Sequence, residues 1–298
     1  MKFSIKGLGV ALVTPFNDNG AIDYNSMFKL IDHVIEGGVD YIVLFGTTGE
    51  APTISLQEKQ EALKKASSHI NGRVPIVLGF GGNYTAKLLE EMSLFDFTGA
   101  SAILSVMPYY NKPNQDGIFM HYKAISEKSP LPTILYNVPG RTVVNMEAET
   151  TIRIANECKN VIAIKEATDN MDQIMDLINN KPKELEVVAG DDALALPIIS
   201  VGGHGVISVI ANAYPKEFAK MTHAALKGDM EEARHYHYLL LPIMHTLLKM
   251  GNPSGIKAIL HMKGIINHVF RLPVHPVNEA KFNEILKVVE QTEKNCCK

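Results

Sequence analysis

The sequence predicts a (β/α)8 barrel, the TIM-barrel architecture, followed by a helical appendage at the C-terminus. Eight short apolar runs recur along the chain, and longer amphipathic segments separate them. The runs are rich in Val and Ile, which favours strands buried on both faces, as in a parallel sheet. An open doubly wound sheet is the structural alternative. Eight successive units without a larger break favour the closed barrel.

The predicted strands are named here by their residue ranges. They are 7–16, 39–46, 74–81, 100–108, 131–138, 161–168, 185–192 and 205–210. We expect residues 1–214 to form the barrel with the active site. From about residue 215 the strand pattern stops, so residues 215–298 are predicted to be a helical region packed on the barrel. Breaks are expected at Gly228-Asp229, at 251–253 and at 271–277.

The segments between the runs carry helix signals. Residues 23–38 repeat apolar side chains at helical spacing, with Asp23 as the predicted N-cap and Gly37 near the C-cap. Residues 55–70 begin with the capping-box pair Ser55 and Glu58. The helical pattern returns at 145–156 and at 169–180.

Composition excludes several classes of protein. The chain has 298 residues and a formal net charge of −3 at pH 7, so no basic surplus points to nucleic acid or to an anionic membrane. No apolar stretch reaches the ~18 residues of a membrane span, and the N-terminus lacks a signal-peptide pattern. Cys158, Cys296 and Cys297 are too few and too unevenly spaced for a disulfide framework. We expect a protein of the reducing cytoplasm.

Active sites of such barrels lie at the carboxyl ends of the strands. The polar residues predicted there would all face one mouth. They are Thr14 with Pro15, "GTTGE" at 46–50, "PYYN" at 108–111, "YNVPGR" at 136–141, Lys165 with Glu166, and "GDD" at 190–192.

Lys165 lies near the end of an apolar strand. Burial in apolar surroundings disfavours a charged amine, and a neutral amine can attack a ketone to form an imine, or Schiff base. The alternative is a structural lysine in a buried ion pair with Glu50 or Glu166. Position alone leaves both readings open.

Two other segments hold groups that suit a small anionic substrate. In "GTTGE", the hydroxyls of Thr47 and Thr48 and several backbone N–H groups could hold a carboxylate, although a glycine-rich turn with a Thr cap explains the motif equally well. Arg141, in the predicted loop after Pro139-Gly140, has a guanidinium that matches a carboxylate. A surface or interface salt bridge is the commoner role of an arginine.

Tyr110 and Tyr136 also lie at strand ends. A tyrosine there can pass protons between water and a buried site, or it can be a packed aromatic side chain with a hydrogen-bonded hydroxyl. Asp191 and Asp192 could bind a divalent ion, but capping of the next helix is the expected role. We predict neither a metal nor an organic cofactor.

Four motifs in this order, "GTTGE", "PYYNKP", "YNVPGRT" and "IKEAT", resemble those of the dihydrodipicolinate synthases, now called 4-hydroxy-tetrahydrodipicolinate synthases. These enzymes belong to a wider group of pyruvate-dependent lyases and aldolases that includes N-acetylneuraminate lyase. The resemblance runs from about Gly7 to Pro276. Arg141 in "YNVPGRT" points to the synthases, because the sialic acid lyases do not usually carry arginine there.

The resemblance implies a role for each matched residue. Lys165 would form the imine with pyruvate, and Tyr136 would relay its proton. Thr47 and Tyr110 would form hydrogen bonds to Tyr136, and Tyr110 would come from a neighbouring subunit. Thr47 and Thr48 would bind the pyruvate carboxylate, and Arg141 would bind the carboxylate of aspartate semialdehyde. Gly190 and Ile207 would line the pocket through their backbones. The assembly implied is a homotetramer, a dimer of tight dimers, without cofactor.

Two rival functions remain at this point. A 2-keto-3-deoxy sugar acid aldolase or an N-acetylneuraminate lyase would use the same Lys165, and Arg141 is the feature against it. A catalytically inactive barrel that binds a small molecule is a different class. The intact set of Thr47, Tyr110, Tyr136, Arg141 and Lys165 is the feature against that class.

One departure from the family pattern concerns regulation. Many bacterial members are inhibited by lysine at a separate site at the tight dimer interface. Sensitive members tend to carry Ser, two His and Glu at the positions of Ala51, Leu56, Lys59 and Lys87, whereas Asn83 and Tyr109 are retained here. Because Lys59 and Lys87 would repel the ammonium of a lysine ligand, weak or no feedback inhibition is expected.

Overall fold

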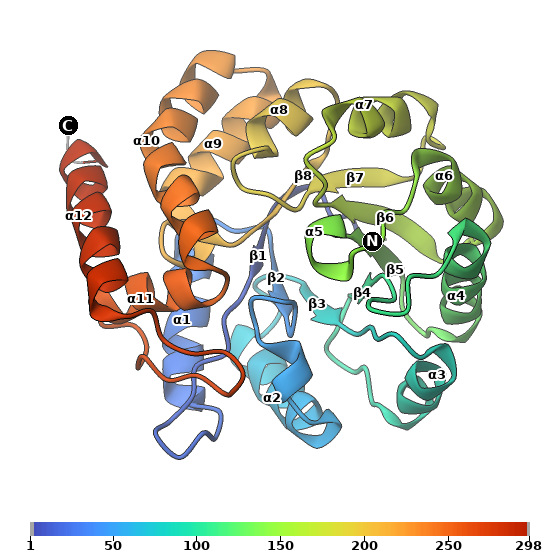
Figure 1. The fold of residues 1–298 in the computed structure, drawn as a ribbon, viewed down its shortest axis with the longest axis horizontal. Coiled ribbons are helices and arrows are strands. Elements are labelled where there is room, and N and C mark those ends of the chain that lie inside the picture. Colours follow the sequence, from blue (N-terminus) through green and yellow to red (C-terminus); the bar gives the residue numbers. More distant parts are fainter. Residues whose placement is uncertain (1–2, 297–298) are drawn as a thin grey trace.

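The computed structural model describes residues 3–296 and confirms the closed barrel. Eight parallel strands pair in sequence order, and β1 closes on β8 (Figure 1). The strands are β1 Gly7–Ala11, β2 Tyr41–Leu44, β3 Ile76–Gly79, β4 Ala102–Val106, β5 Thr133–Asn137, β6 Val161–Glu166, β7 Glu186–Ala189 and β8 Gly205–Ser208. Each lies within one of the eight predicted ranges. The open sheet is therefore wrong for this chain.

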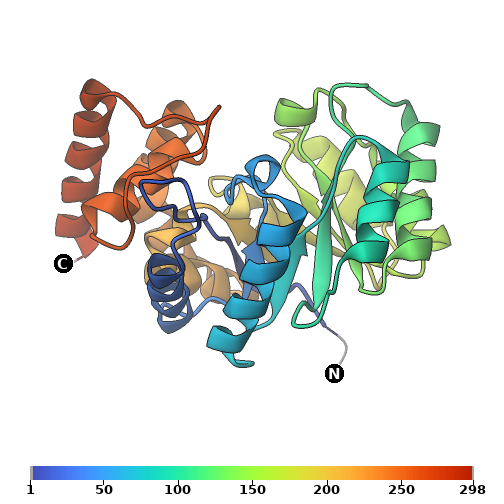
Figure 2. The same ribbon diagram turned by 90° about the horizontal axis from the view of Figure 1, so that it is seen from below.

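Helices surround the barrel and then extend to one side of it. Around the barrel are α1 Tyr24–Glu36, α2 Leu56–Ile70, α3 Thr85–Leu94, α4 Gln115–Lys128, α6 Ala148–Glu157, α7 Met171–Asn180, α8 Ala195–Ser200 and α9 Pro215–Lys227. Short helical turns occur at η1 Ala51–Thr53, α5 Pro139–Thr142 and η2 Ile210–Asn212. The last helices are α10 Met230–Met250, α11 Ser254–Met262 and α12 Glu279–Cys296, which stand beside the barrel (Figure 2).

Local capping explains where the predicted helices begin. The Asp23 side chain accepts from the Ser26 N–H at 3.1 Å, and α1 ends at the Gly37 cap. In α2, Ser55 and Glu58 form both hydrogen bonds of the capping box. These backbone N–H groups have no partner inside the helix, so the caps supply one. Both predictions are confirmed.

Successive side chains along each strand point to opposite faces of the sheet, so the barrel has two hydrophobic cores. One set of side chains packs between the barrel and its helices, and the other fills the barrel interior, where Tyr41, Val77, Tyr136 and Ile207 lie. Tyr41 occupies the space beside β1, since a Cβ at Gly9 would lie 2.1 Å from its ring. The interior is therefore filled at its base, and only its mouth is open to a ligand.

The C-terminal helices continue directly from the barrel. Helix α9 contacts β1 and β8, and α10 packs on both α9 and α12. The division of the chain at residues 214 and 215 stays a prediction. Cys158 is a buried thiol, and Cys297 lies outside the described residues. Between residues 3 and 296, none of the helices has both the length and the apolar character needed to cross a membrane.

Because β3 closely approaches the β2–α2 loop, a methyl group added at Gly79 is expected to destabilise the fold. A Cβ at Gly79 would lie 2.0 Å from the carbonyl oxygen of Phe45, whereas a Cβ at Gly82 would meet no atom within 4 Å. We expect Gly79→Ala to lower the free energy of unfolding by more than ~2 kcal/mol, and Gly82→Ala to change it by less than ~0.5 kcal/mol. Urea denaturation of both variants measures this, and equal effects would contradict the packing.

Candidate active site

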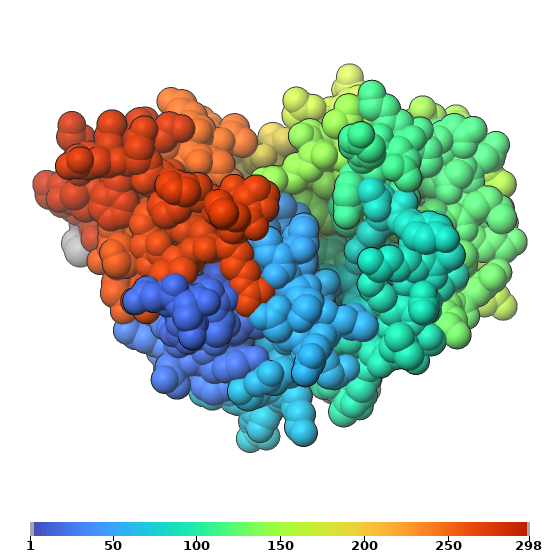
Figure 3. All heavy atoms as spheres, turned by 60° about the horizontal axis from the view of Figure 1, so that its bottom comes forward, coloured from blue at the N-terminus to red at the C-terminus, as the bar shows by residue number. Residues whose placement is uncertain are grey.

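A cavity of about 560 Å³ opens at the carboxyl ends of the strands. On the barrel side it is lined by Thr47, Leu104, Tyr136 and Arg141. It continues into the groove between α2 and α3, where Figure 3 shows the surface hollowed beside the blue α2 segment. The predicted mouth is therefore a real concavity, and it is longer than the barrel opening alone.

Lys165 lies on β6, is only 5% exposed and, unlike Tyr136, is not itself among the residues that line the cavity. Its Nζ is 4.5 Å from the centroid of the Tyr136 ring, because Tyr136 of β5 is paired in register with Lys165. Neither carboxylate considered as an ion-pair partner is bound to it. Glu50 is paired with Lys257, and the Glu166 carboxylate accepts from Asn137. The structural ion-pair reading of Lys165 is therefore wrong.

Gly190 leaves room for the lysine side chain. A Cβ at this position would lie 2.9 Å from Cε of Lys165 and 2.6 Å from Cβ of Ala167. The Gly190 N–H donates to the backbone oxygen of Glu166 at 2.6 Å, which ties the end of β7 to β6. Ile207 on β8 is fully buried in the same interior cluster as Tyr136.

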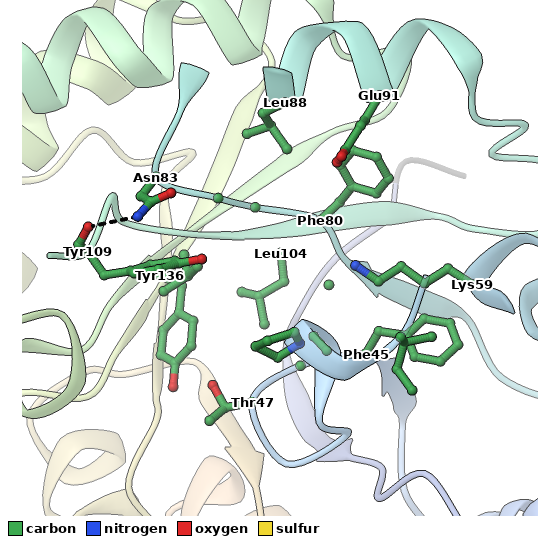
Figure 4. Close-up of a pocket in the computed structure, with 18 of the residues that line it drawn as sticks. Phe45, Thr47, Lys59, Phe80, Asn83, Leu88, Glu91, Leu104, Tyr109 and Tyr136 are labelled. Carbon is green, nitrogen blue, oxygen red and sulfur yellow. Dashed lines mark hydrogen bonds between the residues drawn. The ribbon is translucent and has the colours of Figure 1, made fainter. Parts of the chain in front are cut away.

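The β2–α2 loop presents its threonines at the mouth. Thr47 lines the cavity, and Figure 4 shows its side chain and the Tyr136 hydroxyl pointing toward one another. Thr48 is buried, and its Oγ1 accepts from Nδ2 of Asn252 at 3.0 Å. The loop is also held from below, where the Thr14 hydroxyl donates to the Gly49 carbonyl at 2.7 Å.

Arg141 lies in the one-turn helix α5, so the predicted loop at this position is wrong. Pro139 begins that helix, where its fixed φ suits the first helical position. The Arg141 side chain lines the cavity, and its Nη2 donates to the Asn252 carbonyl at 3.4 Å. Asn252 therefore contacts two of the three predicted carboxylate-binding residues, Thr48 and Arg141. Sequence reasoning missed it, since its only signal was the break at 251–253.

Tyr110 is placed differently from the other predicted residues. It lies in the loop after β4 with a left-handed φ of 73°, and its side chain is 87% exposed. It is not among the residues that line the cavity of its own chain. A single chain therefore does not bring Tyr110 to Tyr136.

A polar layer lies behind the pair of Tyr136 and Lys165. Asn137 and Glu166 are the next pair in the β5–β6 register, and Nδ2 of Asn137 donates to Oε1 of Glu166 at 2.8 Å. The Thr168 N–H donates to the same oxygen at 3.2 Å. Burial raises the pKa of Glu166 to about 8, against the opposing effect of these hydrogen bonds. Burial thus favours the neutral form of the glutamate next to Lys165.

Asp191 accepts from the N–H groups of Ala193 and Leu194, at 2.8 Å and 3.3 Å, in the turn that leads into α8, whereas Asp192 does not have the expected capping role. Helix α8 begins at Ala195 without a side-chain cap. Instead, Asp192 accepts from the N–H groups of Val209 and Ile210, at 3.1 Å and 2.8 Å, and so holds the end of β8. Among residues 3–296, no three His, Cys, Asp or Glu side chains gather as a group able to hold a metal ion.

A (β/α)8 barrel with a buried lysine beside a tyrosine at its mouth belongs to a class of enzyme barrels that work through side-chain chemistry at the strand ends. Comparison with known proteins agrees. Residues 4–292 match the model of the dihydrodipicolinate synthetase family. The chain is a member of the dihydrodipicolinate synthetase family.

Individual relatives are similar over nearly their whole length. The 4-hydroxy-tetrahydrodipicolinate synthase of Parabacteroides distasonis is 47% identical, over 98% of this chain and 99% of that protein. A dihydrodipicolinate synthase of Acinetobacter baumannii, solved in complex with pyruvate, superposes with a TM-score of 0.94 at 37% identity, over 97% and 99% of the two chains. A DHDPS of Cyanidioschyzon merolae with lysine bound gives a TM-score of 0.92 at 35% identity, over 97% and 98%.

The raised pKa of Glu166 predicts a specific pH dependence of stability. Its ordinary value is 4.5 and its folded value about 8, so between these the folded state keeps a proton that the unfolded state has released. Stability from this group is therefore lost as pH rises through about 8. Relative to Glu166→Gln, the free energy of unfolding of the unmodified chain should fall by on the order of 4 kcal/mol from pH 4 to 9.

Urea denaturation of both proteins at a series of pH values measures this difference. Glu166→Gln is the matched control, since glutamine keeps an acceptor for Asn137 but cannot ionise. Parallel curves across the range would show that the carboxyl ionises in the folded state at its ordinary value.

Proposed function

We propose that this chain condenses pyruvate with L-aspartate 4-semialdehyde through a Schiff base on Lys165. The product is 4-hydroxy-tetrahydrodipicolinate, in the first committed step of diaminopimelate and lysine biosynthesis. The observation that carries the proposal is the Lys165 side chain, buried 4.5 Å from the Tyr136 ring and unpaired with either neighbouring glutamate. Family membership supports the substrates, since relatives at this level of identity bear the name of that synthase.

The chemistry follows from an amine in an apolar interior. The Lys165 amine attacks the ketone of pyruvate, and loss of water gives the imine. Removal of a methyl proton gives the enamine, whose carbon attacks the aldehyde. The amine of the semialdehyde then displaces Lys165 and closes the ring. Tyr136, beside the lysine, is the proposed proton carrier, with its hydroxyl directed at Thr47 (Figure 4).

The proposal also assigns a binding role to residues around Lys165. We assign the pyruvate carboxylate to Thr47 and Thr48, and the pocket wall to the backbones of Gly190 and Ile207. Arg141 is the proposed ligand of the semialdehyde carboxylate. Its guanidinium is held at the cavity wall by the Asn252 carbonyl, which leaves the other N–H groups of its fork for a carboxylate.

The exposed position of Tyr110 supports an assembly of several chains. We propose that Tyr110 of a second copy completes the relay to Tyr136, because within one chain it points into solvent and lies outside the cavity. A homotetramer of tight dimers and a cytoplasmic location, without a nucleic-acid or membrane partner, complete the proposal.

Trapping of the imine tests the role of Lys165. With pyruvate and borohydride, the unmodified chain should gain one covalent adduct, and Lys165→Ala should gain none and lose at least ~10³-fold in kcat. Lys159→Ala is the matched control, since Lys159 is an exposed lysine just before the same strand. Mass spectrometry reads the adduct. An adduct that survives in Lys165→Ala would place the nucleophile elsewhere.

Substrate competition separates the rival functions. In a coupled assay, turnover should occur with aspartate semialdehyde and not with N-acetylmannosamine or glyceraldehyde. Arg141→Ala should raise the KM for the semialdehyde by about tenfold or more and leave pyruvate trapping intact. Turnover with a sugar aldehyde alone would favour the rival aldolases. Binding of pyruvate without an adduct would favour the inactive barrel.

The groove between α2 and α3 supports a second proposal, weak or absent inhibition by lysine. The positions that depart from the sensitive pattern, Ala51, Leu56, Lys59 and Lys87, line this cavity together with Asn83 and Tyr109. Lys59 extends toward the cavity beside Phe80 (Figure 4), and burial lowers its pKa. Nζ of Lys87 lies 3.8 Å from Oε1 of Glu91. This ion pair occupies a carboxylate that the ammonium group of a lysine ligand would need as its partner.

Steady-state rates with added lysine check this proposal. Activity should be unchanged at lysine concentrations up to the millimolar range, because two ammonium groups already face the groove. A loss of activity at sub-millimolar lysine would contradict it.

A further inference from the structure

The loop that carries Thr47 and Thr48 is held in a strained conformation. Phe45 and Glu50, at its two ends, have left-handed φ values of 55° and 56° although neither is glycine. Such residues persist only where the surroundings fix them, because the conformation costs about 1 kcal/mol or more each. Both side chains are buried, so the fixing contacts are internal ones.

The contacts that fix Glu50 come from the C-terminal appendage. Its Oε1 accepts from Nζ of Lys257 on α11, and both side chains are fully buried. The backbone N–H of Arg271 donates to Oε2 at 3.4 Å. A buried carboxylate needs a partner charge, and Lys257 is the cation paired with it here.

Lys257 is itself held in one place. Its Nζ also donates to the Val269 carbonyl at 3.0 Å, and it lies 4.5 Å and 4.7 Å from the ring centroids of Phe16 and Phe270. The amine is therefore enclosed by two rings, a carbonyl and one carboxylate. Five residues before it, Asn252 binds the Thr48 hydroxyl, so the same segment contacts the loop twice.

We infer that Lys257 is a positioning residue for the proposed reaction, acting through Glu50 on the backbone and hydroxyls of Thr47 and Thr48. Lys257 touches no substrate. It keeps the strained loop in the form that receives the carboxylate of the keto acid. The inference rests on the proposed function, and it makes the appendage part of the binding site rather than a support for the barrel.

Kinetics of Lys257→Met test the inference, since methionine fills a similar volume without charge. The KM for pyruvate should rise by about tenfold or more, while the KM for the semialdehyde stays within about twofold. At saturating pyruvate, borohydride should still trap the adduct on Lys165. A purely structural role would lower the melting temperature and leave the ratio of the two KM values unchanged, and that result would overturn the inference.

Glu58→Gln is the matched control. Glu58 pairs with Arg271, so it docks the same appendage onto α2, outside the strained loop. Glutamine keeps an acceptor for the Ser55 N–H and removes the ion pair. This variant should lose stability and keep the KM for pyruvate within about twofold. An equal rise in this KM would show that loose docking in general, not Lys257, is responsible.

The double variant Glu50→Gln with Lys257→Met covers the case in which the single variant does not fold. It removes both charges together, so no unpaired carboxylate is buried. Its KM for pyruvate should still rise by about tenfold, since the loop has lost its anchor. An unchanged KM would overturn the inference. Failure of the unmodified chain to trap pyruvate would instead overturn the proposed function.

Discussion

The parallel register between β5 and β6 is the constraint on which the site depends. It sets Tyr136 opposite Lys165 and, one residue on, Asn137 opposite Glu166. Because side chains alternate between the two faces of a strand, the first pair points into the barrel and the second away from it. A slip of β6 by one residue could set Glu166 opposite Tyr136 and so place a carboxyl group at the mouth. The hydrogen bond between Asn137 and Glu166 holds the strands against that slip.

Glu166 and Glu50, the two glutamates considered as partners of Lys165, are bound elsewhere, each by a different means. Glu166 is buried behind the strand, and burial raises its pKa to about 8, which favours the neutral form. Glu50 is ionically paired with Lys257, from the other side of the loop. Lys165 is left beside an aromatic ring in an apolar interior. A lysine in a salt bridge would be a poor nucleophile. The contacts that hold these two carboxyl groups away from Lys165 are therefore as much a part of the site as the lysine itself.

The appended helices reach the mouth of the barrel through the segment from Asn252 to Lys257. Asn252 joins two of the predicted carboxylate-binding positions, Thr48 and Arg141, and Lys257 holds the end of the threonine loop. Barrels of this class build their sites on loops of varied conformation over a constant scaffold. Here a separate part of the chain fixes the threonine loop, which explains how the strained backbone at Glu50 is maintained.

The sequence by itself determined the strands, the capped helices and most residues of the mouth. These depend on local physics: apolar runs that suit a doubly buried strand, side-chain caps within three residues, and the rule that polar strand ends meet at one edge. The fold class, the burial of Lys165 and the capping box at Ser55 follow from such signals.

Tertiary structure alone decided which groups pair. Glu50 and Lys257 are 207 residues apart in the chain, and Thr48 and Asn252 are 204 apart. Which side chains pair at such separations depends on how the closed barrel brings the loops together, and no local sequence pattern encodes it. The same reason explains why the sequence assigned Asp192 to a helix cap and left the partner of Glu50 open. Closure of the barrel determines the distances, and the distances determine which charges are paired.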